Sequence, residues 1–169
     1  GDRIAVMKDG VLQQCDAPMA LFRHPTNMFV AGFIGTPSMN FVNGTLQKSA
    51  GAGYSVHCDS FTVAVPAFEA GKLEQWIGKS VVWGVRPSDI FDAGRKGAIE
   101  PTPENTIVTQ VDVVEPMGDI ATVYLTVGPH SLVATLDSET TAAEGNALKV
   151  ALDLGRTHLF DPVTELAIF

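Results

Sequence analysis

The stretch from residue 25 to residue 40 divides the chain into two different kinds of sequence. Its apolar positions fall on one face of a short helix, which Gly35 and Pro37 bring to an end. After it, apolar and polar positions alternate over about 130 residues, interrupted by Gly, Pro, Asn and Asp, and this pattern is typical of strands and turns. The sequence therefore predicts a mainly β region over residues 37–169 and a short α/β appendage over residues 1–36.

The appendage is expected to contain a hairpin and two short helices. Ile4–Met7 is an apolar strand, and an Asp-Gly pair after it favours a tight turn into a second strand. Asp16 can cap a helix that starts near Pro18, and Thr26 or Asn27 can cap the next one. Nearly every side chain of the first strand is apolar, as in strands covered on both faces. We therefore expect an exposed hydrophobic surface that self-association or folding back onto the β region buries.

The β region is expected to consist of many short strands. A short helix is predicted over residues 66–76, and a long loop over residues 92–105, where two glycines and two prolines occur among several charges. Short strands joined by Gly and Pro turns favour a sandwich or a small OB-like barrel, an architecture that by itself leaves the function open. The expected strands are residues 41–48, 54–58, 61–65, 80–85, 107–114, 121–127, 130–136, 147–154, 157–160 and 165–169.

The charge balance argues against one class of partner. The net charge is −8 and the eleven Lys and Arg residues are scattered, whereas nucleic-acid binding needs a basic patch. Cys15 and Cys58 lie far apart with no second Cys or His at metal-ligand spacing, so we expect reduced thiols in a reducing compartment. No apolar run approaches the length of a membrane-spanning helix, and no basic-then-apolar leader opens the sequence. Any membrane association is therefore expected to come through a partner protein.

Candidate catalytic groups lack the partners that catalysis needs. Glu115 and Asp119 flank a glycine turn, where acidic strand ends are far commoner than an acid/base couple. Ser131 follows His130 without an orienting acid at a readable spacing. His158 lies on an apolar strand, which favours a buried core histidine over a metal ligand. The sequence therefore predicts no catalytic residue, no metal site and no cofactor site in this chain.

The beginning of the chain carries the most specific pattern. Its elements are Gly1-Asp-Arg-Ile-Ala-Val-Met-Lys-Asp-Gly10, then Ala17-Pro18 and Leu21-Phe22, then Phe29-Val-Ala-Gly-Phe-Ile-Gly35 through Pro37 to Met39-Asn40. Sparser pieces follow, namely Gly84-Val-Arg-Pro87 with Asp89, Val114-Glu115 with Gly118, and His158-Leu-Phe160. Together these pieces resemble, in order and spacing, the ATP-binding subunits of ABC importers for sugars and related solutes, the maltose-importer type.

The resemblance implies that the chain is the C-terminal part of a longer parent. Residues 1–36 would be the end of a nucleotide-binding domain, and residues 37–169 an OB-like TOBE regulatory domain. The sequence has no Gly-x-x-x-x-Gly-Lys-Ser/Thr phosphate loop, no Leu-Ser-Gly-Gly-Gln type signature and no acid-terminated apolar strand for magnesium. This fragment is therefore expected not to be an enzyme, while a parent ABC-type ATPase would bind ATP and Mg²⁺. By the resemblance, the parent would dock on membrane-spanning permease subunits at the cytoplasmic face of the inner membrane.

The Arg-Pro corner is the polar group that the resemblance singles out. Arg86, Pro87 and Asp89, with Glu115 and Gly118, are candidate contacts in a homodimer of regulatory domains or with an inhibitory regulator protein. The structural alternative is that Arg86 bonds carbonyls or a carboxylate and so locks the corner, while Pro87 ends the preceding strand.

A second function from another class stays open, a free-standing OB-like module that binds a small oxyanion or an oligosaccharide. Oxyanion capture needs converging N–H groups, hydroxyls and Lys or Arg side chains, and the sequence has no obvious cluster of them. The transported solute stays open as well, since sugar, glycerol phosphate and polyol all fit the resemblance.

Overall fold

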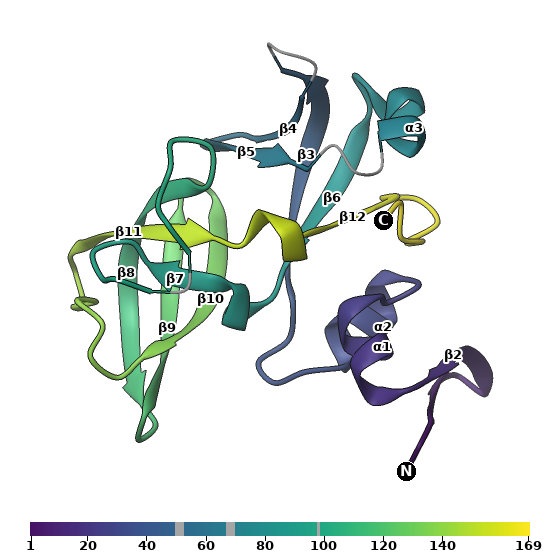
Figure 1. Ribbon diagram of the computed structural model, residues 1–169, viewed down its shortest axis with the longest axis horizontal. Coiled ribbons are helices and arrows are strands. Elements are labelled where there is room, and N and C mark those ends of the chain that lie inside the picture. The colour runs from purple at the N-terminus through teal and green to yellow at the C-terminus, as the bar shows by residue number, and fades with distance from the viewer. Residues whose placement is uncertain (50–52, 67–69, 98) are drawn as a thin grey trace.

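The computed structural model describes residues 1–49, 53–66, 70–97 and 99–169, and it is mainly β, as predicted (Figure 1). The appendage begins with an antiparallel hairpin of β1 (Ile4–Lys8) and β2 (Val11–Asp16). Two short helices follow, α1 (Pro18–Arg23) and α2 (Met28–Phe33). In Figure 1 the appendage lies at the lower right, beside the β region. None of the described helices is long and apolar enough to cross a membrane.

The two helices of the appendage start in different ways. Asn27 caps α2 as predicted, because its side-chain oxygen accepts a hydrogen bond from the Val30 N–H at 2.9 Å. The prediction that Asp16 caps α1 was wrong. The N-cap position is Ala17, and the Asp16 carboxylate accepts a hydrogen bond from the Ala17 N–H instead. Pro18 stands at the first helical position, where its fixed φ starts the helix without a side-chain cap.

Apolar side chains of the appendage are divided between a small core and the surface. Val6, Leu21 and Val30 are buried together. The large hydrophobic side chains that stay exposed are Ile4, Met7, Val11, Leu12, Met19 and Phe33. The predicted exposed hydrophobic surface is therefore present. The described β region does not cover these six side chains, and their burial by self-association stays a prediction.

The first sheet of the β region is antiparallel and has the strand order β12-β6-β3-β4-β5. Its strands are β3 (Asn40–Lys48), β4 (Tyr54–Cys58), β5 (Phe61–Val65), β6 (Ser80–Val85) and β12 (His158–Phe160). Between β5 and β6 the chain forms α3 (Ala70–Leu73) and the 3-10 turn η2 (Glu74–Trp76). α3 and η2 account for part of the helix that was predicted over residues 66–76. Residues 67–69 of that prediction lie outside the described residues.

The second sheet is also antiparallel and has the order β10-β9-β8-β11-β7. Its strands are β7 (Ile90–Asp92), β8 (Thr106–Pro116), β9 (Ile120–Val127), β10 (His130–Asp137) and β11 (Ala147–Leu152). The chain crosses between the sheets twice, through η3 (Pro87–Asp89) and through η4 (Leu154–Arg156). The first crossing is the Arg-Pro corner.

One apolar core joins the two sheets. Trp83 of β6 is fully buried in it, together with inward-facing side chains of β3, β4, β8, β9, β10 and β11. Phe61 packs edge-on against Trp83, with the ring centroids 6.0 Å apart. Because the same core serves both sheets, the β region is one folding unit rather than two separate barrels.

Asn40 fastens the two sheets through hydrogen bonds. Its Nδ2 donates to the carbonyls of Val85 at 3.1 Å and Val133 at 2.9 Å, and its Oδ1 accepts from the Val133 N–H at 2.7 Å. The side-chain amide therefore bonds β10 in the way that the backbone of a neighbouring strand would.

The prediction of a last strand over residues 165–169 was wrong. The segment, which we call the C-terminal strap, makes only the isolated bridges of Leu166 with Asn27 and of Ala167 with Phe160. It faces the appendage on one side and β12 on the other, and it bonds each of them in turn. A continuous ladder with either one is therefore not formed.

Candidate functional site at the Arg-Pro corner

Arg86 joins the β region to the ends of both appendage helices. It lies between β6 and η3 and is 2% exposed. Its Nε and Nη2 donate to the Phe22 carbonyl at 3.0 and 2.6 Å. Its Nη1 donates to the carbonyls of Ala31 at 3.2 Å and Ile34 at 2.6 Å. The structural alternative for Arg86 is therefore observed, since the guanidinium bonds carbonyls and locks the corner.

The position of these carbonyls explains why a buried cation is stable there. They belong to the last turns of α1 and α2, where C=O groups lack helical partners and carry partial negative charge. The guanidinium carbon of Arg86 also lies 3.9 Å from the centroid of the Phe22 ring. Burial lowers the pKa of Arg86, and the charge of Asp89 raises it in part. Carbonyl dipoles and the aromatic face thus replace much of the water that the cation loses.

Gly35 makes room for this contact, and Pro87 turns the chain beside it. Gly35 has a φ of +112°, and a Cβ added to it would lie 3.1 Å from Arg86 Nη1 and 3.3 Å from a carbon of the Phe22 ring. Pro87 is buried and starts η3 after β6 has ended, as predicted. A side chain at position 35 would push the arginine away from the helix ends.

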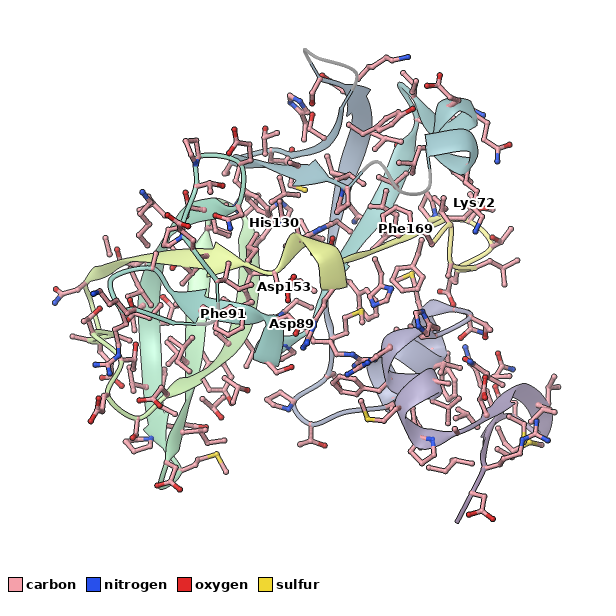
Figure 2. All side chains as sticks on the ribbon, in the orientation of Figure 1. Lys72, Asp89, Phe91, His130, Asp153 and Phe169 are labelled. Carbon is pink, nitrogen blue, oxygen red and sulfur yellow. The ribbon has the colours of Figure 1, made fainter. Side chains whose placement is uncertain are left out.

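Asp89 is the second buried charge at the corner, also 2% exposed. Its Oδ1 accepts a hydrogen bond from Arg156 Nη1 at 3.3 Å, and Arg156 Nε lies 3.3 Å from Asp153 Oδ2. Burial raises the pKa of Asp89, whereas the hydrogen bond and charge of Arg156 lower it in part. The Asp153 N–H donates to the Asp89 carbonyl at 3.0 Å, and Figure 2 shows the two residues close together near the middle of the view. The two crossings between the sheets are therefore fastened to each other.

The C-terminal strap is the second connection between the appendage and the β region. On the appendage side, the Met28 N–H donates to the Glu165 carbonyl and the Ala167 N–H donates to the Thr26 carbonyl, both at 2.9 Å. On the other side, the Ile168 N–H donates to the Leu159 carbonyl of β12 at 2.7 Å. Arg86 and the strap together form what we call the joint.

His158 lies beside the joint and is 8% exposed, which confirms the prediction of a buried histidine. The pKa of His158 is lowered to about 4, mainly by burial and in part by the charge of Arg86, while a hydrogen bond to the backbone of Phe169 opposes the shift. The imidazole is therefore neutral at pH 7.

A pocket of about 840 Å³ opens at the joint. Its wall includes Phe22, Arg23 and Thr26 from the appendage, Arg86 and Arg156 from the two crossings, and the end of the strap. In Figure 2 Lys72 and Phe169, which also line the pocket, lie near each other at the right of the β region. The pocket thus draws its wall from segments that are far apart in sequence.

Glu115 and Gly118 are not brought to the Arg-Pro corner. Glu115 is exposed at the end of β8, where its Oε2 accepts a hydrogen bond from the Tyr124 hydroxyl at 3.4 Å. Gly118 lies in the turn between β8 and β9 with a φ of +87°. In Figure 1 this turn is at the lower left, away from the appendage. Of the five candidate contacts, the structure therefore gathers Arg86, Pro87 and Asp89, and leaves the other two on a separate hairpin.

The remaining polar candidates, His130 and Ser131, are not arranged as a catalytic pair. His130 Nε2 lies 3.0 Å from Asp59 Oδ2, and the His130 ring packs edge-on against Phe61. Ser131, next to it in sequence, is exposed. Within the described part of the chain, no three His, Cys, Asp or Glu residues are grouped so that they could hold a metal ion.

Sequence reasoning missed most of the joint. The partners of Arg86 are backbone carbonyls that lie 52 to 64 positions earlier in the chain. Every residue type has such a carbonyl, so no sequence signal marks these three. Arg156 was missed for a different reason, since only the fold brings η4 beside Asp89.

The fold and the Arg-Pro corner define a class of structure. It is an OB-type β region whose buried arginine bonds a helical appendage. Residues 35–90 match a family model described as the MalK OB fold domain. The fold is also similar to that of the cytoplasmic molybdate-binding protein ModG, solved with molybdate bound, with a TM-score of 0.57 over 73% of this chain and 96% of that chain. The sequences are 17% identical, so this likeness shows the fold alone. The predicted OB-like fold is thereby confirmed.

Similarity by sequence extends along the whole chain. Identity is 36% over 169 residues to the trehalose/maltose import ATP-binding protein MalK of Thermococcus litoralis, and 34% over 168 residues to the oligosaccharides import ATP-binding protein MsmX of Bacillus subtilis. It is 36% over 166 residues to YcjV of Escherichia coli O157:H7, an uncharacterized ABC transporter ATP-binding protein. These alignments cover 100%, 98% and 98% of this chain and 45%, 44% and 43% of the relatives, so the chain spans less than half of their length. The chain is thus similar along its whole length to ATP-binding proteins of ABC importers, and its residues 35–90 match the MalK OB fold domain, as the resemblance implied.

Proposed function

We propose that this chain is the C-terminal regulatory and dimerisation part of the ATP-binding subunit of an ABC importer for a sugar or a related solute. The observation that carries the proposal is the similarity along the whole chain, at 34% and 36% identity, to proteins named for trehalose/maltose and oligosaccharide import. The parent protein would hydrolyse ATP on a nucleotide-binding domain of which residues 1–36 are the end, and this fragment would not be an enzyme.

The joint supports a role in passing movement from one domain to the other. Arg86 bonds the ends of α1 and α2 directly, and the strap bonds the segment that leads into α2. A rotation of the nucleotide-binding domain would therefore carry the β region with it. The exposed apolar side chains of the appendage support the same proposal, because the rest of a nucleotide-binding domain would cover them.

The proposed partners follow from the parent protein. They are a second copy of the subunit, the membrane-spanning permease subunits and an inhibitory regulator protein, which would place the complex at the cytoplasmic face of the inner membrane. Glu115, at the end of β8, and Gly118, on the β8–β9 turn, are the candidate contacts exposed to a partner, whereas Arg86 is used inside the chain.

The coding sequence upstream of Gly1 tests the proposal first. We expect it to encode a phosphate loop, a signature motif and a histidine shortly before Gly1. The extended protein should then hydrolyse ATP, and residues 1–169 alone should not. An upstream region without these motifs, or an extended protein without ATPase activity, contradicts the proposal.

A titration of residues 1–169 with molybdate, sulfate and maltose-type sugars separates this function from a free-standing oxyanion or oligosaccharide module. The proposed function predicts no saturable binding of these ligands to the chain alone. Micromolar binding of any of them would favour the free-standing module.

A further inference from the structure

We propose that the pocket at the joint binds an organic anion, a molecule that carries a phosphate or carboxylate group on an apolar ring or chain. The proposal needs only residues 1–169 and does not rest on the proposed function. A volume of about 840 Å³ is within the range of small-molecule sites.

The charge of the wall favours an anion. The whole chain has a net charge of −8, yet four of its eleven Lys and Arg residues, namely Arg23, Lys72, Arg86 and Arg156, line this pocket. Among the described lining residues, Asp89 has the one side-chain carboxylate, and Phe169 adds a terminal carboxylate in the fragment of residues 1–169, so the four cations outnumber the anionic groups. The pocket is therefore a positive region on a protein whose average charge is negative.

Arg23 is the cation best placed to meet a ligand. The guanidinium of Arg86 is used on helix carbonyls, and that of Arg156 bonds Asp89 and contacts Asp153. The side chain of Arg23 is exposed and makes no hydrogen bond or ion pair with any described residue. A charge at the mouth of a pocket that no internal group neutralises attracts an anion at the lowest cost in desolvation.

The apolar part of the wall requires more than an inorganic anion. Met19 and Phe22 of α1 face the pocket from the appendage, and Ala167 and Ile168 face it from the strap. A bare phosphate would leave these groups in contact with water, whereas a neutral sugar would leave the charge of Arg23 without an anionic partner. A ligand with an apolar body and an anionic group satisfies both parts of the wall.

A bound ligand would tighten the joint. It would contact α1, the strap and the Arg-Pro corner at once, so it would stabilise the docked position of the appendage relative to a detached one. Binding should therefore be visible as slower hydrogen exchange in α1 and α2 as well as in a titration.

Calorimetric titration of residues 1–169 with four small probes tests the proposal. The probes are 1-naphthyl phosphate, 1-naphthoate, neutral 1-naphthol and inorganic phosphate. We expect saturable binding of at least one naphthyl anion with a Kd below about 1 mM, and binding about tenfold weaker for naphthol and for inorganic phosphate. Which naphthyl anion binds more tightly identifies the anionic group.

A pair of charge reversals assigns the site. Arg23→Glu should weaken binding of the anion about tenfold, because an attraction becomes a repulsion. Lys149→Glu makes the same change at an exposed position of β11, away from the pocket, and should leave the Kd within about twofold. The proposal would be overturned if neither naphthyl anion bound saturably, or if the two variants weakened binding equally. It would also be overturned if naphthol bound as tightly as the anions, or inorganic phosphate as tightly as naphthyl phosphate.

Discussion

The appendage and the β region are each stabilised by a different kind of contact. The β region has one large apolar core, in which both sheets bury side chains around Trp83. The appendage buries a cluster of Val6, Leu21 and Val30, and exposes more large apolar side chains than it buries. It is fastened to the β region by hydrogen bonds from Arg86 and from the C-terminal strap, and by a small apolar cluster in which Ala31 of α2 packs with Val82 and Phe160.

This difference indicates which part can fold alone. Apolar burial is the main stabilising term in folding, so the β region should determine the overall stability of the chain. The appendage has too small a core to stand alone, and its order should depend on the joint. The following predictions test this division of roles.

The largest effect is expected from Trp83→Ala. Removal of a fully buried tryptophan from the shared core should lower the free energy of unfolding by about 4 kcal/mol. Urea unfolding followed by circular dichroism measures it. The matched truncation Leu21→Ala, in the small core, should loosen the appendage and leave the midpoint of the β-sheet transition unchanged. If Leu21→Ala moves that midpoint as far as Trp83→Ala does, the two regions fold as one unit.

Arg86→Ala should have the next largest effect, and it should be local. It removes the cation that bonds the carbonyls of Phe22, Ala31 and Ile34, so the opening of α1 and α2 should become easier by about 3 kcal/mol. Native-state hydrogen exchange at the Ala31 and Ile34 amides measures this opening, with the amides of β9 as an internal reference. Equal acceleration in β9 would mean that Arg86 supports the β region as well.

His158 should make the stability of the chain depend on pH. Its pKa is lowered from 6.5 to about 4 in the folded state, so the unfolded chain binds a proton below pH 6.5 that the folded chain does not. This contribution is full above pH 6.5 and is lost as the pH falls from about 6.5 to about 4. Between pH 7.5 and pH 5 the loss should be about 2 kcal/mol.

Urea unfolding at the two pH values measures this loss in the native chain and in two variants. His158→Gln should lack it, whereas His57→Gln, at an exposed position of β4, should keep it. A native chain whose stability is the same at both pH values would show that the buried imidazole does not keep a lowered pKa.

The smallest effect is expected from Arg95→Ala. Arg95, like Arg86, donates to a backbone carbonyl, which is that of Glu139. Arg95 also pairs with the Glu139 carboxylate, and both side chains of this pair are exposed. Exposed pairs contribute little, so the free energy of unfolding should change by about 0.5 kcal/mol. Thermal unfolding of the variant measures it. A loss close to that of Arg86→Ala would show that burial does not distinguish the two arginines.

Much of the β region could be predicted from the sequence because half-buried strands have a period of two. Ala121, Val123 and Leu125 alternate with outward or polar neighbours, and the structure buries all three in β9. The pairing of strands could not be predicted in this way. For example, β11 lies between β8 and β7, and only the tertiary fold brings those three segments together.

Of the candidate site, only the Arg-Pro corner could be predicted from the sequence. An Arg followed by Pro at the end of a predicted strand was visible in the sequence. Of the two partners expected for Arg86, carbonyls or a carboxylate, the structure has carbonyls. The strap was mistaken for a strand because its residues are apolar enough to be one. The hydrogen bonds that divide it between two neighbours depend on where α2 docks, which no local pattern encodes.

The amide of Asn40 also affects how the protein behaves at high concentration. β10 is the outermost strand in the order of its sheet, and it lies beside β7 and η3. Backbone N–H and C=O groups that stay unpaired on an outer strand can recruit the strand of another molecule. Asn40 occupies both backbone groups of Val133, in the middle of that strand. Asn40, β7 and η3 together leave less of this strand open to a second molecule, which disfavours edge-to-edge aggregation.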